Sequence, residues 1–292
     1  MSAAVPAFLG DIPEHLRDPR DARFHILPVP YDATSTWKKG ADLGAEAIIE
    51  ASAEMELYDI QTASEPYMLG AATHAPIVCA DEPEAMCDLV EAGVGASLDG
   101  GHTPIVLGGE HSVSIGAIRA AGARFENLTT LQIDAHSDTR ETYLGSKCNH
   151  ACVMARAREV SHIVQVGIRS MDAQEMPALD PARVLFAHEI VGGSGASEDE
   201  GLISRVCDLL TPEVYVTVDL DALDPGIMPA TGTPEPGGLS WGQVNQLLDA
   251  VTGRSRVVAC DVVELCPRED LWACDFLAAR LVYRMMAMIG RS

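Results

Sequence analysis

The sequence predicts an α/β protein built on a mainly parallel β-sheet, with helices covering both faces. Short runs of aliphatic and β-branched residues alternate along the chain with longer stretches of helical character. Most of the short runs are apolar at every position, which is typical of strands that are buried on both faces of a parallel sheet. With 292 residues, of which 47% are hydrophobic, the chain is long enough to bury such a core.

Seven strands and seven helices follow from this alternation. The apolar runs predict strands over 24–29, 104–108, 128–134, 162–168, 183–188, 214–220 and 256–265. The stretches between them predict helices over 44–58, 84–99, 112–122, 150–159, 200–210, 240–252 and 271–289. The Gly- and Ser-rich segment with its acidic continuation, 192–200, is expected to be a flexible loop. Because no Pro/Ser-rich linker and no internal repeat divides the chain, we expect a single domain over 1–292, with 1–22 as an N-terminal extension.

The charge of the chain excludes one class of partner. Its 43 acidic and 20 basic residues give a formal net charge of −23, and no Lys/Arg cluster offsets it. Such a surface repels phosphate backbones, so we expect no nucleic-acid binding. The same acidic field would favour a cationic small molecule, although high acidity is also a common solubility feature.

Neither end of the chain predicts a membrane segment. The C-terminal run LWACDFLAARLVYRMMAMI is interrupted by Asp275, Arg280 and Arg284, which fits a packed helix better than a membrane span. The N-terminus lacks the basic region and apolar stretch of a secretory signal. We therefore expect a soluble, cytoplasmic protein whose eight cysteines, none in a CxxC pair, are reduced packing thiols rather than disulfides or zinc ligands.

Polar residues stand at four of the expected strand ends, where ligands bind in parallel α/β sheets. They belong to the segments PIVLGGEHS, LQIDAHSD, VYVTVDLDALDPG and VVACDVVELCP. In LQIDAHSD, alternate positions place Asp134, His136 and Asp138 on one face if the strand continues through them. Asp219 and Asp221 are also two residues apart, so their carboxylates can face the same cavity.

This collection of acids predicts a metal centre. Several unpaired carboxylates packed together would cost several kcal/mol or more, and divalent cations would remove that cost. The candidate ligands are two histidines and four aspartates: His111, Asp134, His136, Asp138, Asp219 and Asp221. Nitrogen and oxygen donors without a thiolate suit a harder ion such as Mn²⁺, and a pair of such ions can activate water for hydrolysis.

Isolated polar residues have simpler interpretations. Asp224, in DALDPG, is interpreted as a turn former. The remaining histidines outside the candidate segments are interpreted as ordinary core or surface residues: His15, His25, His74, His102, His162 and His188.

Beyond these arguments, the sequence resembles the ureohydrolase family, which includes arginases and agmatinases. Three segments resemble its metal-binding signatures: GGEHS (108–112), DAHSD (134–138) and DLDALDPGIMPATGTPEPGGL (219–239). Further likeness lies in PVPYD (28–32), KGADLGAEAI (39–48), VGIRSMDAQE (166–175) and DVVELCP (261–267), so the resemblance covers nearly the whole chain from about residue 24. It implies a three-layer α/β/α sandwich around a mainly parallel eight-stranded sheet, the arginase/deacetylase-like fold.

The resemblance also implies a cofactor and roles for individual residues. Two Mn²⁺ ions per chain would be bound, one by His111, Asp134, Asp138 and Asp219, the other by His136, Asp134, Asp219 and Asp221. Asp138 would also orient the attacking hydroxide, Glu264 would pair with the substrate guanidinium, and His150 would shuttle a proton to the departing amine.

The loop before the proton-shuttle position bears on the substrate. Arginases carry SGNxHG there, whereas this chain reads TRETYLGSKCNHACVM (139–154), which keeps Asn149 and His150 but has Ala151 in place of glycine. The loop is closer to the agmatinase group, although it lacks that group's SHGT pattern. The leading expectation is hydrolysis of agmatine, a small cationic guanidino substrate, to urea and putrescine in polyamine biosynthesis.

Three alternatives remain open at this point. The substrate could be guanidinobutyrate or guanidinopropionate, with Lys147, Arg140 or Arg169 as the partner of its carboxylate. The chain could also be a non-catalytic guanidine- or polyamine-binding member that kept the fold, or a zinc deacetylase with a single metal on a similar fold. The resemblance also implies a homo-oligomer, a trimer or a hexamer.

Overall fold

The computed structural model describes residues 7–78, 82–191 and 196–291, and the side chains of 196–200 are not included in that description. Its centre is one sheet of eight parallel strands in the order β2-β1-β3-β8-β7-β4-β5-β6. The strands are β1 (Phe24–Val29), β2 (Ala71–Thr73), β3 (Thr103–Gly108), β4 (Leu128–Ile133), β5 (His162–Ile168), β6 (Val184–Phe186), β7 (Glu213–Asp219) and β8 (Arg256–Val263). This arrangement confirms the predicted fold class.

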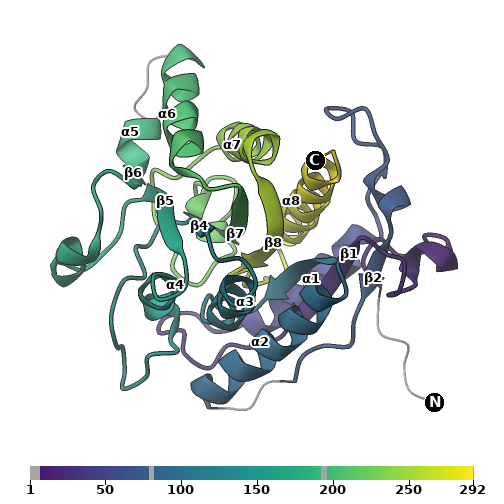
Figure 1. The fold of residues 1–292 in the computed structure, drawn as a ribbon, viewed down its shortest axis with the longest axis horizontal. Coiled ribbons are helices and arrows are strands. Elements are labelled where there is room, and N and C mark those ends of the chain that lie inside the picture. The colour runs from purple at the N-terminus through teal and green to yellow at the C-terminus, as the bar shows by residue number, and fades with distance from the viewer. Residues whose placement is uncertain (1–6, 79–81, 192–195, 292) are drawn as a thin grey trace.

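Helices cover both faces of the sheet (Figure 1). The α-helices are α1 (Gly44–Ser52), α2 (Pro83–Asp99), α3 (Val113–Gly122), α4 (Val153–Ala157), α5 (Ala187–Val191), α6 (Ala196–Leu209), α7 (Trp241–Arg254) and α8 (Trp272–Gly290). Short 3-10 helices span Glu14–Arg17, Ala41–Leu43, Pro66–Leu69, His150–Cys152, Ala173–Ala178 and Leu220–Ala222. The first layer consists of α2, α3 and α4, and the second of α1, α8, α7 and α6.

The core divides into two apolar clusters, one on each face, because successive side chains of a strand point in opposite directions. In β3, Ile105 and Leu107 join the cluster under α1, α7 and α8, whereas Val106 joins the cluster under α2, α3 and α4. Both faces of the central strands are therefore buried, which explains why their sequences are apolar at nearly every position. Within the described residues, no helix is both long enough and apolar enough to cross a membrane.

The structure corrects several predicted boundaries. The strand expected over 183–188 ends at Phe186, and the next residues form α5. The helix expected over 44–58 ends at Ser52, whose hydroxyl donates to the Ile49 carbonyl and accepts the Leu9 amide. The helix expected from residue 150 opens with a 3-10 turn, and the loop expected over 192–200 lies outside the described residues up to 195 and then forms the start of α6.

One strand was missed altogether. β2 consists of Ala71, Ala72 and Thr73, which pair with β1 at the edge of the sheet. Two alanines and a threonine form no apolar run, so nothing in the local sequence predicts a strand there. Pairing with β1 supplies the stabilisation that local propensity lacks.

The strand order fixes the place of the functional site. The four central strands, β3, β8, β7 and β4, lie side by side although they come from distant parts of the chain. Their carboxyl ends therefore meet at one edge, and these are the four strand ends at which the sequence carries polar residues.

Candidate metal centre

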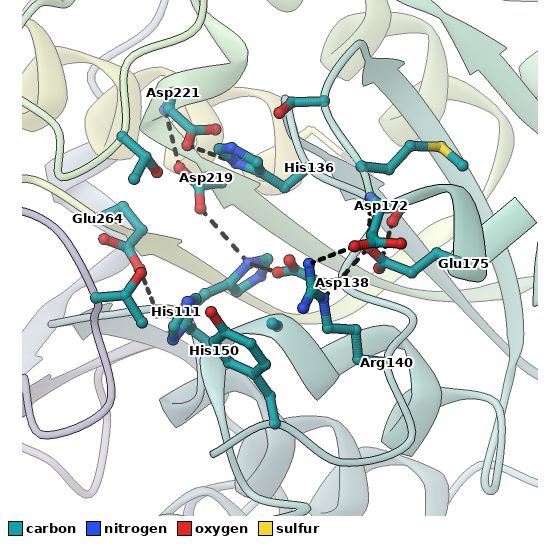
Figure 2. Close-up of a pocket in the computed structure, with 17 residues that line it drawn as sticks. His111, His136, Asp138, Arg140, His150, Asp172, Glu175, Asp219, Asp221 and Glu264 are labelled. Carbon is teal, nitrogen blue, oxygen red and sulfur yellow. Dashed lines mark hydrogen bonds and ion pairs between the residues drawn. The ribbon is translucent and has the colours of Figure 1, made fainter.

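A cavity of about 350 Å³ opens at this edge and is lined by residues from all four central strand ends (Figure 2). Its floor contains His111 after β3, Asp219 and Asp221 at the end of β7, and Glu264 after β8. His136 and Asp138, which follow β4, complete it. The residues predicted from four separate segments are thus brought together in one cavity.

A close backbone contact holds the segment that carries His111. A Cβ on Gly109 would lie 1.9 Å from the Tyr31 carbonyl oxygen, so only glycine fits between β3 and the chain that leaves β1. The next two backbone amides are also hydrogen-bonded: the Glu110 amide donates to the Tyr31 carbonyl (2.9 Å), and the His111 amide donates to Glu264 Oε1 (2.8 Å). The backbone contacts of the Gly-Gly turn therefore fix the position from which the His111 side chain enters the cavity.

The first group of candidate ligands surrounds His111 Nδ1. This nitrogen lies 2.9 Å from Asp138 Oδ2, 3.1 Å from Asp134 Oδ2 and 3.5 Å from Asp219 Oδ2. All four side chains are buried. Three carboxylates and one imidazole thus converge on one small volume.

The second group surrounds His136 Nδ1, which lies 2.9 Å from Asp221 Oδ2 and 3.7 Å from Asp134 Oδ1. Asp134 belongs to both groups, with one oxygen directed toward each histidine. A carboxylate shared in this way fits a pair of adjacent cations.

The tautomer of His111 can be deduced from its hydrogen bonds. Its Nε2 lies 2.9 Å from the Thr217 hydroxyl, which donates its only proton to Asp261 Oδ1 (2.6 Å). Tyr215 donates to the other Asp261 oxygen (2.5 Å), so this buried carboxylate is an acceptor at both ends. Thr217 must then accept from His111 Nε2–H, so in the neutral ring Nδ1 is the nitrogen that bears the lone pair.

That lone pair is the observation that tests for a metal. His111 Nδ1 is buried and has no hydrogen-bond partner among the described residues, although three carboxylate oxygens lie within 3.5 Å of it. A lone pair facing anionic oxygens is repulsive, and despite burial the neighbouring Asp134 and Asp138 raise the pKa of His111 well above its usual range. The site therefore requires a positive charge among these groups, either a proton on Nδ1 or a bound cation. The residues present therefore fit a divalent cation, with nitrogen and oxygen donors only.

The pKa values of the carboxylates also indicate a cation site. Burial, together with the neighbouring Asp134, raises the pKa of Asp138 to about 6. Burial, with Asp221 and Asp134, raises the pKa of Asp219 well above its usual range. Two divalent cations would favour the ionised forms and remove this penalty.

The geometry corrects the simple alternation expected for LQIDAHSD. β4 ends at Ile133, and Asp138 lies beyond it with a left-handed φ of 50°. The Asp138 carbonyl accepts hydrogen bonds from the Met154 and Ala155 amides, which hold this unfavourable conformation. Glu264 has a φ of 66° and is also left-handed, so two of the predicted catalytic residues leave their strands on bends rather than on the pleat.

The predicted proton-shuttle residue, His150, lines the same cavity (Figure 2). It opens the 3-10 turn after Asn149, whose side chain accepts the Ala151 amide (3.1 Å). The Tyr143 ring meets the His150 ring edge-on, with centroids 5.8 Å apart. Burial lowers the pKa of His150 to about 4, so its ring is neutral at pH 7.

A second polar group, formed by Arg140, Asp172 and Glu175, also lines the cavity. The two acids were not predicted as part of the site, and Arg140 was considered only as a partner for a substrate carboxylate. Arg140 lies 3.4 Å from Glu175 Oε2 and 3.8 Å from Asp172 Oδ2, and its guanidinium stacks 4.5 Å from the Tyr143 ring centroid. Glu175 also accepts from the Ser137 hydroxyl at 2.6 Å. The resemblance had included 166–175 as a segment without assigning a role to either acid.

Other residues were missed because they support the site from behind. Gln132 Nε2 donates to Asp134 Oδ2 (2.7 Å), and Thr217 and Asp261 orient His111. A signal for two of them exists: Gln132 and Thr217 are polar residues inside buried strands, each two positions before a candidate ligand. Such a residue shares a face with the ligand.

The remaining sequence predictions are accounted for elsewhere. Asp224 accepts the amides of Gly226, Gly237 and Gly238 and is a turn former, as predicted. The seven cysteines that the structure describes are free thiols, and neither candidate metal group contains one. Three of the histidines form a stack outside the site: His25, His74 and His102.

Comparison with known proteins identifies the family. The family model described as the arginase family matches residues 22–288. The chain belongs to the arginase family. This confirms the resemblance noted in the sequence, including its eight-stranded fold.

Three similar proteins act, by their names, on agmatine or on an agmatine derivative. An N(1)-aminopropylagmatine ureohydrolase of Thermus thermophilus is 36% identical over 92% of this chain and 91% of its own length. An agmatinase of Pyrococcus horikoshii is 30% identical over 94% of both chains. The crystal structure of the agmatine ureohydrolase of Thermoplasma volcanium superposes with a TM-score of 0.86 at 30% identity, covering 99% of this chain and 96% of that one. These relatives confirm the prediction of an amidinohydrolase of the agmatinase-like type.

Proposed function

We propose that this arginase-family member hydrolyses the guanidino group of a cationic substrate, agmatine in the first instance, to urea and an amine. The observation that carries the proposal is the buried His111 nitrogen, whose lone pair faces three carboxylates at the floor of an acidic cavity. That arrangement fits metal-assisted hydrolysis. The product from agmatine would be putrescine.

Two Mn²⁺ ions are the proposed cofactor. One would be held by His111, Asp134, Asp138 and Asp219, the other by His136, Asp134, Asp219 and Asp221. When bound, such ions polarise water and offset the charge of the carboxylates. A single structural zinc fits less well, because the ligand set divides into two groups that share Asp134.

Glu264 is proposed to bind the guanidinium. Its Oε1 is committed to the His111 amide, which leaves Oε2 to accept N–H bonds from the substrate. A buried carboxylate paired with a planar guanidinium forms a strong, directional contact. Asp138, besides its proposed role as a metal ligand, would accept a hydrogen bond from the attacking water and so orient it.

His150 is proposed to supply the proton that the leaving amine needs. When the C–N bond breaks, its electron pair goes to the departing nitrogen, which must be protonated to leave as a neutral amine. The His150 ring lies in the cavity wall and is 22% exposed, so it can exchange protons with solvent between turnovers.

The surroundings of the basic residues favour a cationic substrate tail over an acidic one. The guanidinium of Arg169 already donates hydrogen bonds to the backbone carbonyls of Asp221, Glu235 and Pro236. Lys147 is exposed and does not line the cavity. Arg140 does line it but faces two carboxylates, so that wall carries a net negative charge.

A second candidate substrate is N1-aminopropylagmatine, and a specific observation favours it. Relatives at 33% and 36% identity carry the name of this activity. Two partly exposed carboxylates would pair with an additional ammonium group: Asp172 lines the cavity, and Glu235 lies beside it, 4.0 Å from His136 Nε2. Hydrolysis would then release spermidine instead of putrescine, with the same chemistry at the guanidino end.

A substrate panel tests the proposal. After loading with Mn²⁺, urea release is measured for agmatine, N1-aminopropylagmatine, guanidinobutyrate, guanidinopropionate and arginine. We expect the two agmatine compounds to be cleaved with the highest kcat/KM. Cleavage of guanidinobutyrate alone would overturn the proposal of a cationic substrate. Metal analysis showing one zinc per chain would overturn the proposed dinuclear centre.

Variants sharpen the assignment. Arg140→Gln leaves Asp172 and Glu175 without their cation, so the ratio of kcat/KM for agmatine over guanidinobutyrate should rise about fivefold, the effect of roughly 1 kcal/mol. Lys147→Gln, on the same loop but outside the cavity, is the matched control and should leave the ratio unchanged. Unimpaired urea release by His136→Ala would overturn the dinuclear mechanism, because His136 is a proposed ligand of the second ion. The expected assembly, a trimer or hexamer, is measured by light scattering.

A further inference from the structure

Thr34 lies between His150 and the buried Glu110, whose Oε2 is 3.8 Å from His150 Nδ1, beyond hydrogen-bond distance. It follows β1, is 8% exposed, and its hydroxyl oxygen lies 2.7 Å from Glu110 Oε2 and 3.1 Å from His150 Nδ1. The same oxygen accepts the backbone amide of His150 at 3.1 Å. Three contacts thus converge on one hydroxyl, and two of them come from the proposed proton-shuttle residue.

The direction of each bond follows from counting protons. Glu110 is fully buried and accepts the Ser112 hydroxyl at Oε1, while its Oε2 receives Thr34. A threonine hydroxyl has one proton and two lone pairs. Because the proton goes to Glu110, both lone pairs remain to accept, one from the His150 amide and the other from the His150 ring.

We infer that Thr34 is a positioning residue that holds His150 in the tautomer with its ring proton on Nδ1. The inference rests on the proposed function, in which His150 carries the proton to the leaving amine. Thr34 does not line the cavity and has no hydrogen bond to the candidate metal ligands, so it acts through the histidine alone.

This tautomer has a direct chemical consequence. With Nδ1–H donating to Thr34, Nε2 is the nitrogen that takes a proton from solvent and passes it to the departing nitrogen as the C–N bond breaks. Nδ1 keeps its proton throughout, so each cycle begins and ends with the same neutral ring and an Nε2 lone pair. The other tautomer would present Nε2–H to solvent, and its single ring proton would have to move to Nδ1 before Nε2 could accept a proton.

Kinetics provide the first test. Thr34→Val keeps the shape of the side chain and removes the hydroxyl; we expect kcat for the best guanidino substrate to fall about tenfold with KM nearly unchanged, because one hydrogen bond orients the general acid. Thr34→Ser should restore most of the rate. Thr130→Val is the matched control, since its buried hydroxyl pairs with Ser161 away from the cavity.

A double variant separates this inference from the proposed function. If Thr34 acts through His150, then Thr34→Val causes no additional loss in a His150→Ala background. A further tenfold loss there would overturn the inference while leaving the role of His150 intact. A fully active His150→Ala enzyme would overturn the proposed role of the histidine itself.

A spectroscopic readout needs neither metal nor activity. Nitrogen-15 spectra of histidine-labelled, metal-free protein distinguish a protonated ring nitrogen from one that bears a lone pair. At pH 8.5, the His150 signal should report Nδ1–H in the unmodified chain and in Thr34→Ser, in both of which the hydroxyl accepts from the ring. Thr34→Val should show a mixture of tautomers; an unchanged Nδ1–H signal there would refute the inference.

Discussion

Two histidines of the cavity are oriented by the same device, a threonine whose proton is committed to a buried acid. Thr217 donates to Asp261 and accepts from the Nε2 of His111, which turns the Nδ1 lone pair toward the metal groups. Thr34 donates to Glu110 in the corresponding way beside His150. In each case the buried acid accepts the threonine proton and thereby determines the tautomer of the histidine, although the acid itself makes no hydrogen bond to the ring.

The residue-scale prediction concerns Thr217. Thr217→Val removes the acceptor for His111 Nε2–H, so the ring can adopt the tautomer with a proton on Nδ1, which cannot bind a cation. We expect manganese affinity to fall roughly 10- to 100-fold, the usual effect of losing a partner behind a metal-binding histidine. Competition with a fluorescent chelator measures it.

The control is again Thr130→Val, which removes a buried hydroxyl from β4 without touching a ligand. Equal losses of manganese affinity in the two variants would mean that general destabilisation, and not the histidine tautomer, is responsible.

At the scale of elements, the local sequence pattern predicted the strands that are apolar throughout, but not the features that depend on contacts with distant segments. The apolar strands were found within a few residues because they are buried on both faces. β2 was missed because its three residues form a strand only by pairing with β1. Asp138 and Glu264 depart from alternation because hydrogen bonds from other segments hold them in left-handed conformations.

A stack of histidines connects elements on the side of the sheet away from this cavity. The ring of His25, in β1, stacks on His102 at 3.8 Å and meets His74 at 4.4 Å between centroids. Its two nitrogens pair with Ser97 in α2 and with the Pro19 carbonyl. Burial, then the neighbouring His102 and His74, lowers the pKa of His25 to about 4 despite that carbonyl contact.

This lowered pKa predicts acid sensitivity with a defined sign. The native ring stays neutral down to about pH 4, whereas the unfolded chain takes up a proton near pH 6.5, so the free energy of unfolding falls as the pH drops from 6.5 toward 4. The loss should reach about 2–3 kcal/mol, and urea unfolding at several pH values measures it. His25→Gln cannot titrate, and its stability should fall less over the same interval; an identical slope in both proteins would show that other groups are responsible.

For the whole molecule, the strand order creates the site. β8 and β7 insert between β3 and β4, so segments more than a hundred residues apart place their carboxyl ends together. Repulsion among the crowded carboxylates lowers the stability of the folded chain, and bound cations would offset that repulsion. Metal binding and global stability should therefore be coupled.

Chelation tests this coupling. Removing the metal should lower the melting temperature, since a ligand at 100 times its Kd stabilises the native state by about 2.7 kcal/mol, and adding Mn²⁺ back should restore it. Asp134→Asn, which alters the carboxylate shared by both groups, should lose most of this chelator-sensitive stabilisation. A melting temperature that chelation does not change in the unmodified chain would contradict the coupling.

The sequence by itself determined the fold class and the candidate ligands. Burial on both faces makes a parallel strand apolar throughout, and the need to place acids at strand ends makes them conspicuous against that background. The three segments around His111, Asp134 and Asp219 therefore identified the family without coordinates.

Only the tertiary structure decided which atoms meet. Strand order brought Glu264 beside His111, and contacts between distant segments gave Thr217 and Thr34 their roles. A threonine in a strand or loop looks the same in sequence whether its hydroxyl meets solvent or a catalytic ring. Its proton is assigned by partners more than forty residues away, and folding alone brings them within hydrogen-bond distance.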